Sequence, residues 1–207
     1  MIIEKLEVGA YAANCYIVSD GTSREGIVID PGAEAGRILR RVKDMGLNIK
    51  AIVLTHGHID HVGAVQEVKE ATGAEVAIHA DDAGILQTSS PLSAMLGIPV
   101  EMSAPPDRLL EDGDSLTAGK LLLSVIHTPG HTPGGICLLA EQSVFTGDTL
   151  FNSSIGRTDL GGGSYDQLIG AIQSKLMTLP DDTAVYPGHG PETTIEAERR
   201  LNPFLRG

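Results

Sequence analysis

The sequence predicts an α/β protein built as a four-layer αββα sandwich, in a single domain over residues 1–207. Strand-like apolar runs are followed by helical patterns, and this order occurs twice along the chain. Each half offers two helices that can cover the outer face of a sheet. Because no low-complexity linker or short-period repeat divides the 207 residues, the length favours one large domain over two ordinary ones.

The first half begins with three strands that are separated by turn residues: 2–8, 14–19 and 26–30. Apolar residues at helical spacing then predict a helix that ends at Gly46: Ile38, Leu39, Val42 and Met45. Residues 50–55 are almost wholly apolar, which is typical of a strand buried on both faces. A second apolar stripe predicts one helix that ends at Gly73: Val62, Val65 and Val68. A strand over 75–79 and a short helix over 80–88 complete this half.

The second half follows a Ser- and Pro-rich segment, 88–106, which we expect to form a loop or cap with Met95 and Leu96 as packing residues. Three strands are predicted next: 121–126, 135–139 and 143–145. Ser164 and Gln167 form a capping box before a helical stripe that ends at Pro180. After a strand over 183–186, a second capping box is predicted to open the last helix, which ends near Asn202: Thr193 and Glu196.

Charge and cysteine content limit the classes of partner. The chain has 27 acidic and 15 basic residues, and the net charge of −12 repels nucleic acid and anionic membrane surfaces. Cys15 and Cys137 lie in apolar runs, as small buried residues of a reducing cytosol do. The N-terminus has no apolar signal segment. We therefore expect a cytoplasmic protein without a nucleic-acid or membrane partner, while the oligomeric state stays open.

The strongest functional signal is the segment 55–61, which reads Thr-His-Gly-His-Ile-Asp-His. On an extended loop that leaves a buried strand, His56 and His58 point the same way, so both imidazoles can bind one metal ion. Asp60 and His61 lie where the next helix begins, and the helix dipole favours an ionised carboxylate there. These two residues can serve a second metal ion.

Three further loops each place one candidate ligand just beyond a predicted strand: His131, Asp148 and His189. Glycines beside each of them allow the backbone to approach a crowded centre. Taken singly, each would be an ordinary turn residue. Together with the segment 55–61, they complete the ligand set of a metal centre.

These residues resemble the metallo-β-lactamase superfamily, and within it the short single-domain bacterial type of glyoxalase II-like (hydroxyacylglutathione hydrolase-like) enzymes. The resemblance runs from the Asn-Cys-Tyr of residues 14–16 to the Asn-Pro-Phe of residues 202–204. It implies two divalent metal ions, zinc first, with iron or manganese as alternatives. The positions that hold one ion match His56, His58 and His131. Those that hold the other match Asp60, His61 and His189, and the position matching Asp148 bridges the two.

The charges of this set agree with that implication. Asp60, Asp148 and a bridging hydroxide offset three of the four charges of two divalent ions and leave about +1. Such a site polarises a carbonyl and stabilises the oxyanion that forms when hydroxide attacks it. Asp60 and Asp148 are therefore assigned as catalytic carboxylates as well as metal ligands. Asp148 also argues against a true β-lactamase, since those enzymes typically have Cys at the matching position.

The substrate implied by the resemblance is a small-molecule thioester such as S-lactoylglutathione. Longer glyoxalase II enzymes carry a C-terminal helical domain with glutathione contacts, which we expect to be absent because the sequence stops at Gly207. Residues 156–159, Gly-Arg-Thr-Asp, resemble the substrate-side loop of the family, and Arg157 is the candidate contact for a substrate carboxylate. An exposed arginine on a loop without that role is the alternative. Gly190 replaces the larger residue of the longer enzymes and alters the expected pocket.

Other readings stay open. Persulfide dioxygenases of the same superfamily resemble the Gly-Arg-Thr-Asp stretch and use one iron, held by positions matching His56, His131 and Asp148, as in the facial triad of non-haem iron oxygenases. A nuclease of the same fold is disfavoured by the acidic charge. An inert binding module has no use for a complete ligand set. His79 and His127 each end a strand and are expected to be hydrogen-bonded structural residues rather than ligands of this centre.

Overall fold

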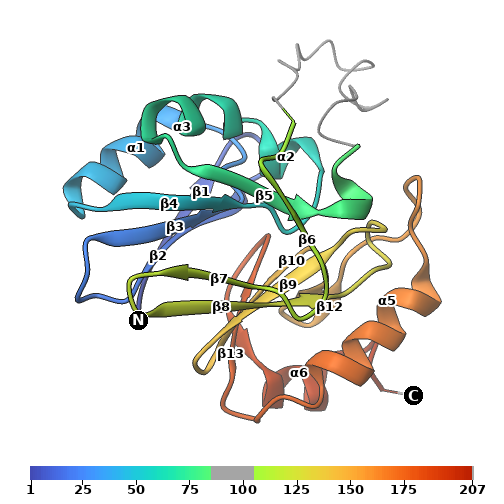
Figure 1. Ribbon diagram of the computed structural model, residues 1–207. Helices are drawn as coiled ribbons and strands as arrows, with labels where there is room; N and C mark the ends of the chain where they lie inside the picture. The colour runs from blue at the N-terminus through green and yellow to red at the C-terminus, as the bar shows by residue number, and fades with distance from the viewer. Residues whose placement is uncertain (85–104, 207) are drawn as a thin grey trace.

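The computed structural model describes residues 1–84 and 105–206. Two six-stranded sheets lie face to face in the middle of the molecule, and helices cover the outer face of each sheet (Figure 1). This arrangement confirms the predicted αββα sandwich of the α/β class.

The first sheet follows the chain, with the strand order β1-β2-β3-β4-β5-β6. Its strands are β1 (Ile2–Val8), β2 (Ala13–Ser19), β3 (Glu25–Ile29), β4 (Asn48–Val53), β5 (Glu75–His79) and β6 (Arg108–Leu110). Strands β1 to β3 pair antiparallel, and β3 to β6 pair parallel. Parallel neighbours need long crossovers, and helix α1 (Ala35–Asp44) lies in the one between β3 and β4, while helix α3 (Val65–Thr72) lies in the one between β4 and β5. The short helix α2 (Ile59–Val62) precedes α3, and a 3₁₀ turn, η1 (Ala80–Asp82), follows β5.

The second sheet has the order β14-β13-β10-β9-β8-β7. Its strands are β7 (Ser115–Ala118), β8 (Leu121–His127), β9 (Ile136–Ala140), β10 (Ser143–Gly147), β13 (Ala184–Pro187) and β14 (Thr193–Thr194). Strands β10 and β13 are parallel. The crossover between them contains the hairpin β11 (Leu150–Phe151) and β12 (Ser154–Ile155). It continues with helix α5 (Tyr165–Ala171) and the π-helical turn η3 (Ile172–Leu176). Helix α6 (Ile195–Leu201) ends the described chain on the same outer face (Figure 1).

Three apolar layers hold these four structural layers together. One lies between the first sheet and its helices, with Ile38, Val65 and Val68 buried. A second fills the space between the sheets, where the rings of Tyr16 and Phe145 meet edge to face with centroids 5.2 Å apart. The third lies between the second sheet and its helices: Leu168, Ile172 and Ile195. Strand β2 is buried along its whole length because it contributes to two of these layers.

The predicted single helix with Val62, Val65 and Val68 is wrong, because the structure divides it into α2 and α3. At the break, the amide of Ala64 donates to the carbonyl of Pro31 at 2.9 Å instead of continuing the helix. A Cβ on Gly63 would lie 2.4 Å from the carbonyl oxygen of Gly32. The segment therefore docks on the turn after β3, and this contact separates the short helix that carries Asp60 and His61.

The first predicted capping box is confirmed, since Ser164 Oγ accepts from the amide of Gln167. The second is displaced by one residue. Thr194 is the cap of α6 and accepts from the amide of Ala197, because Thr193 pairs with Val185 in the sheet. Sequence patterns also missed the short strands β6, β7, β11, β12 and β14.

Part of the predicted helix over 80–88 is the 3₁₀ turn η1, and its remainder past residue 84 lies outside the described residues. Most of the expected loop over 88–106, with Met95 and Leu96, also lies outside them. Over residues 1–84 and 105–206, no helix has both the length and the apolar character that crossing a bilayer requires.

Candidate metal centre

The seven predicted ligands are supplied by loops that leave four strands and by one short helix. His56 and His58 follow β4, and Asp60 and His61 lie in α2. The other three each follow a strand of the second sheet, namely β8, β10 and β13: His131, Asp148 and His189. Loops at the ends of packed strands are where a rigid scaffold commonly places functional side chains. The structure brings all seven together.

The first group consists of three imidazoles, His56, His58 and His131, whose ligand atoms all lie within 4.8 Å of one another. Nε2 of His131 is 2.9 Å from Nδ1 of His58. Nε2 of His56 is buried without a hydrogen-bond partner in the described chain. A buried polar atom without a partner is costly, and a bound cation would remove that cost.

The second group is Asp60, His61 and His189, again with ligand atoms within 4.8 Å of one another. The two Nε2 atoms of His61 and His189 are 3.2 Å apart. Oδ2 of Asp60 lies 3.2 Å from Nε2 of His189. Two ring nitrogens this close repel each other unless a proton or a metal ion lies between them. The geometry therefore fits a cation here as well.

Asp148 lies between the two groups. Its Oδ2 is 3.6 Å from Nε2 of His131 in the first group and 3.7 Å from Nε2 of His189 in the second. Its Oδ1 is 3.4 Å from Nε2 of His61, and among the described residues this buried oxygen has no hydrogen-bond partner. One carboxylate thus faces both groups. The nitrogen and carboxylate donor set suits zinc and other first-row metals.

Asp30, which directly follows β3, orients two of the histidines, and the sequence patterns did not reveal this role. Its Oδ2 accepts from Nδ1 of His61 at 3.0 Å and from the hydroxyl of Thr55 at 2.6 Å. Because that hydroxyl gives its proton to Asp30, it accepts from Nδ1 of His56 at 3.1 Å. Both rings therefore present Nε2 to the centre, as histidine ligands held by an outer carboxylate do. A buried Asp before Pro-Gly at a strand end was the signal available in the sequence.

Two side chains of β2 form hydrogen bonds with the turn that carries His189. The amide of Asn14 donates through Nδ2 to the carbonyls of Pro187, at 2.9 Å, and Gly190, at 3.0 Å. The hydroxyl of Tyr16 donates to the same Pro187 carbonyl at 2.6 Å. Gly188 in this turn needs to be glycine, since a Cβ there would lie 2.3 Å from Oδ1 of Asp148. We refer to Asn14 and Tyr16 as the β2 clasp.

The two groups differ in their affinity for protons. Burial and neighbouring imidazoles lower the pKa of His56 well below its usual value, and that of His58 to about 4. Burial also opposes protonation of His61, but the carboxylates of Asp148, Asp30 and Asp60 together raise its pKa to about 9. The hydrogen bond with His189 holds the pKa of Asp60 at about 2 against its burial. His56 and His58 of the first group are therefore neutral near pH 7, whereas His61 of the second group holds a proton in the absence of a cation.

The backbone of Arg157 lies beside the metal centre, whereas its guanidinium binds Asp159. Its carbonyl accepts from Nδ1 of His131 at 2.8 Å, which leaves Nε2 of that ring for the centre. Its guanidinium forms two hydrogen bonds of 2.7 Å with the carboxylate of Asp159, and the Arg157 side chain is 60 % exposed. The structure therefore places this predicted substrate contact at the surface, already paired with an acid.

Comparison with known proteins identifies the family. The sequence pattern of the metallo-β-lactamase superfamily matches residues 8–189. The chain belongs to this superfamily. Hydroxyacylglutathione hydrolase GloC of Haemophilus influenzae is 40 % identical over 209 residues, covering 99 % of this chain and 98 % of that protein. The resemblance found in the sequence is therefore confirmed at the level of the family and the fold.

Solved structures of the same fold carry several different names. A crystal structure of BLEG-1 B3 metallo-β-lactamase matches with a TM-score of 0.94, 38 % identity and full coverage of both chains. A crystal structure of ETHE1 from Myxococcus xanthus matches with a TM-score of 0.83 and 32 % identity, covering 98 % of this chain and 84 % of that one. The family match and the ligand groups support a metal-dependent hydrolase of this superfamily. The names alone do not select a substrate.

Proposed function

We propose that this chain hydrolyses a small thioester, such as S-lactoylglutathione, at a centre that holds two divalent metal ions. The observation that carries the proposal is the position of Asp148 between two three-residue groups, with ring nitrogens of both groups within 3.7 Å of its carboxylate. The similarity to hydroxyacylglutathione hydrolase GloC over nearly the whole chain supports the thioester as substrate.

In this proposal, each three-residue group holds one of the two metal ions. His56, His58 and His131 would hold one ion, and Asp60, His61 and His189 the other, with Asp148 shared. When bound, two divalent ions lower the pKa of a water molecule and polarise a carbonyl. Asp30 and the carbonyl of Arg157 keep the rings in the tautomers that leave Nε2 free.

The reaction is a hydrolysis whose atoms balance without another reactant. The oxygen of water bonds to the thioester carbonyl carbon, and the carbon–sulfur bond breaks. The products are a carboxylate and a thiol, and one proton passes to solvent. The buried and half-buried imidazoles and carboxylates of the centre give this step a fixed polar environment in place of bulk water.

Arg157 is the proposed contact for a carboxylate of the thiol carrier. Its guanidinium has the forked geometry that binds carboxylates through two hydrogen bonds, and Asp159 uses that geometry in the structure. A substrate carboxylate would take the place of Asp159. Arg157→Gln is then expected to raise KM by about tenfold with a smaller effect on kcat, since it removes binding shared by ground and transition states.

The test combines metal analysis with assays on the same protein. Two zinc ions per chain and hydrolysis of S-lactoylglutathione, lost in His58→Gln, would support the proposal. Two bound ions with hydrolysis of a β-lactam and no thioester cleavage would contradict it, and the match to BLEG-1 makes that assay necessary. Tyr11→Phe, at an exposed residue, is the control for handling of the protein.

A mononuclear iron persulfide dioxygenase is the second candidate. The observation that favours it is the match to ETHE1 from Myxococcus xanthus, together with the juxtaposition of His56, His131 and Asp148. Two histidines and one carboxylate are the facial triad of non-haem iron oxygenases. One iron per chain with oxygen uptake on glutathione persulfide would establish this alternative and exclude the hydrolase.

A further inference from the structure

A second cluster of imidazoles with a carboxylate lies outside the centre described above. His79 ends β5, Asp81 lies in the 3₁₀ turn η1, and His127 ends β8. One ligand atom from each of the three lies within 4.8 Å of the other two. The two rings stack, with centroids 4.1 Å apart and 12° between their planes. Strand ends from both sheets thus bring three possible ligands together at one place.

The hydrogen bonds of His127 leave one nitrogen available. Its Nε2 is 2.9 Å from the carbonyl of Pro133, and because a carbonyl only accepts, Nε2 carries the proton. Within the described part of the chain, Nδ1 of this ring has no hydrogen-bond partner. A ring that donates one N–H to a backbone carbonyl and keeps its other nitrogen for the ion is the usual arrangement of a metal-binding histidine.

The second ring, His79, is held more weakly. Its Nδ1 accepts from the amide of Asp81 at 3.2 Å, and Oδ2 of the same residue lies 3.8 Å from that nitrogen. Parallel rings do not aim both lone pairs at one point, so one ring must turn about its Cβ–Cγ bond to bind an ion. That torsion is soft, and a single long hydrogen bond is lost in the turn.

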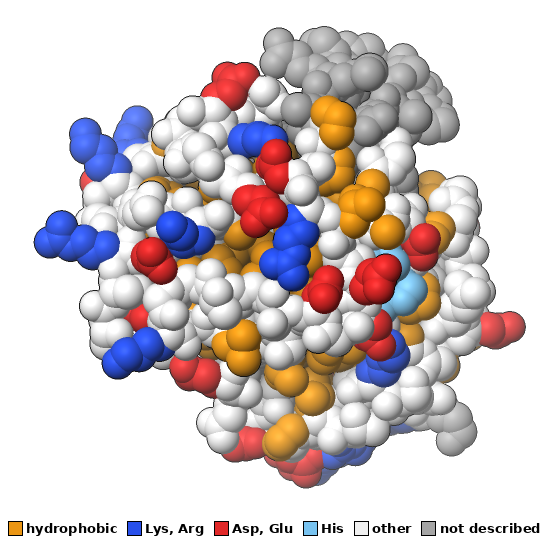
Figure 2. All heavy atoms as spheres, viewed as in Figure 1, with side chains coloured by type: hydrophobic (Ala, Val, Ile, Leu, Met, Phe, Trp, Pro, Cys, Tyr) orange, Lys and Arg blue, Asp and Glu red, His pale blue; other side chains and the backbone are white. Residues whose placement is uncertain are grey.

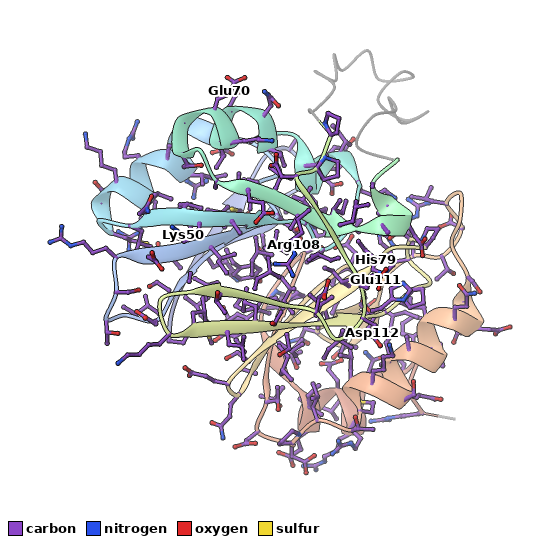
Figure 3. The ribbon with its side chains drawn as sticks, in the orientation of Figure 1. Lys50, Glu70, His79, Arg108, Glu111 and Asp112 are labelled. Atoms are coloured by element: carbon purple, nitrogen blue, oxygen red, sulfur yellow. The ribbon has the colours of Figure 1, made fainter. Side chains whose placement is uncertain are left out.

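The surroundings favour a cation. Figure 2 shows an exposed histidine side chain with acidic side chains around it, in the region where Figure 3 labels His79, Glu111 and Asp112. Asp112 is paired with Lys175 at 2.9 Å, whereas Asp81, Glu111 and the buried Asp82 act on His79 without an ion-paired Lys or Arg among the described residues. Burial and the neighbouring ring of His127 lower the pKa of His79, which favours the unprotonated form that binds a metal ion.

We propose that His79, Asp81 and His127 form a third metal site, separate from the seven-residue centre, that binds a transition ion such as Zn²⁺ at the surface. Two imidazoles and a carboxylate match the ligand types of zinc, and water completes the coordination. Asp82, next to Asp81, accepts from the amides of Gly57 and Gly134 in the loops that carry His56 and His131. The site therefore adjoins those loops without using their ligands.

The experiment counts zinc ions rather than turnover, so that it does not depend on the proposed thioesterase activity. Protein whose seven-residue centre has been loaded and dialysed is titrated with ZnCl₂ by calorimetry. We expect one further equivalent to bind. His127→Gln and His79→Gln should each weaken that binding by at least about tenfold, since even loss of an outer hydrogen-bond partner has that effect.

Asp81→Asn is the variant that guards against misfolding, because the Asp81 side chain is 59 % exposed. It should weaken the additional zinc equivalent and leave the dialysis-resistant metal unchanged. Glu70→Gln, an exposed acid on α3 far from this place in Figure 3, is the matched control and should bind as the wild type does. The same zinc binding in all three site variants, or no additional equivalent in the wild type, would overturn the proposal and leave the histidines as a stacked structural pair.

Discussion

The two halves of the metal centre have the same number of ligands but different chemistry. The half with His56, His58 and His131 has only imidazoles, and burial keeps His56 and His58 unprotonated near pH 7. The half with Asp60, His61 and His189 includes a carboxylate and holds a proton in place of a cation. His56 and His58 can therefore bind a metal ion without loss of a proton. The second half must release one, and it depends on the support of Asp30 and the β2 clasp.

Asp148 joins the two halves, and its replacement should have the largest effect. Asp148→Asn keeps the shape but removes the charge that faces both groups. We expect one metal ion fewer per chain and a loss of kcat of more than about 100-fold, as for loss of a group that stabilises transition-state charge. Elemental analysis and steady-state kinetics measure the two effects. Asp166→Asn, at an exposed acid on α5, should change neither; equal metal content in Asp148→Asn would mean that the halves bind independently of this residue.

Removal of Asp30 should weaken the second half more than the first. Asp30→Asn removes the carboxylate that holds Nδ1 of His61 directly, whereas it reaches His56 only through Thr55. The affinity for the ion in the half with Asp60, His61 and His189 should fall about 10- to 100-fold. The affinity for the ion in the other half should change less. Competition with a chelator measures both affinities. Equal losses at both halves would contradict the asymmetry.

The pH dependence of metal binding should also separate the halves. A metal ion needs the unprotonated form of its ligands, and His61 is charged below its pKa of about 9. Affinity for the second ion should therefore rise about tenfold per pH unit from pH 7 towards pH 9. Proton release from His56 and His58 should contribute little to binding of the first ion above about pH 5, because the pKa of His56 lies well below its usual value and that of His58 is about 4. Calorimetric titrations in buffers of different ionisation enthalpy measure the protons released, and parallel slopes for both ions would count against this account.

Substitutions in the β2 clasp should have the smallest effect on metal binding. Asn14→Ala removes two hydrogen bonds, each worth about 1 kcal/mol, from the turn that carries His189. We expect about tenfold weaker binding of the second ion, while the ion at His56 is retained. Tyr16→Phe removes one bond to the same turn and should give a smaller shift in the same direction. Loss of both ions in Asn14→Ala would point to general destabilisation instead.

The seven residues of the centre were predictable because each follows an apolar strand or opens a helix, and strand ends of packed sheets converge. Their supports were harder to predict. Asp30, Asn14 and Tyr16 act on residues 31 to 176 positions away, through contacts that no local pattern records. The prediction of a single helix was wrong for a similar reason, because the contact of Gly63 with Gly32 divides a continuous apolar stripe into α2 and α3.

Backbone pairing between strands also determines which residues form edge strands and which residue caps a helix. Thr193 has the sequence signature of a cap, but its backbone pairs with Val185, so Thr194 caps α6. Strands β6 and β14 contain three and two residues, too few for an alternating pattern to be visible. Arg157 shows what a sequence motif does not predict about a functional side chain. The loop motif indicates the arginine but not its pairing with the acid Asp159.

Whether the centre holds two ions can be measured by counting metal ions in protein purified without added metal and dialysed to remove weakly bound ions. We expect about two ions per chain in the wild type, one in His58→Gln and one in His189→Gln, with the retained ion in opposite halves. No metal in the wild type, or a single iron unaffected by His189→Gln, would contradict this expectation.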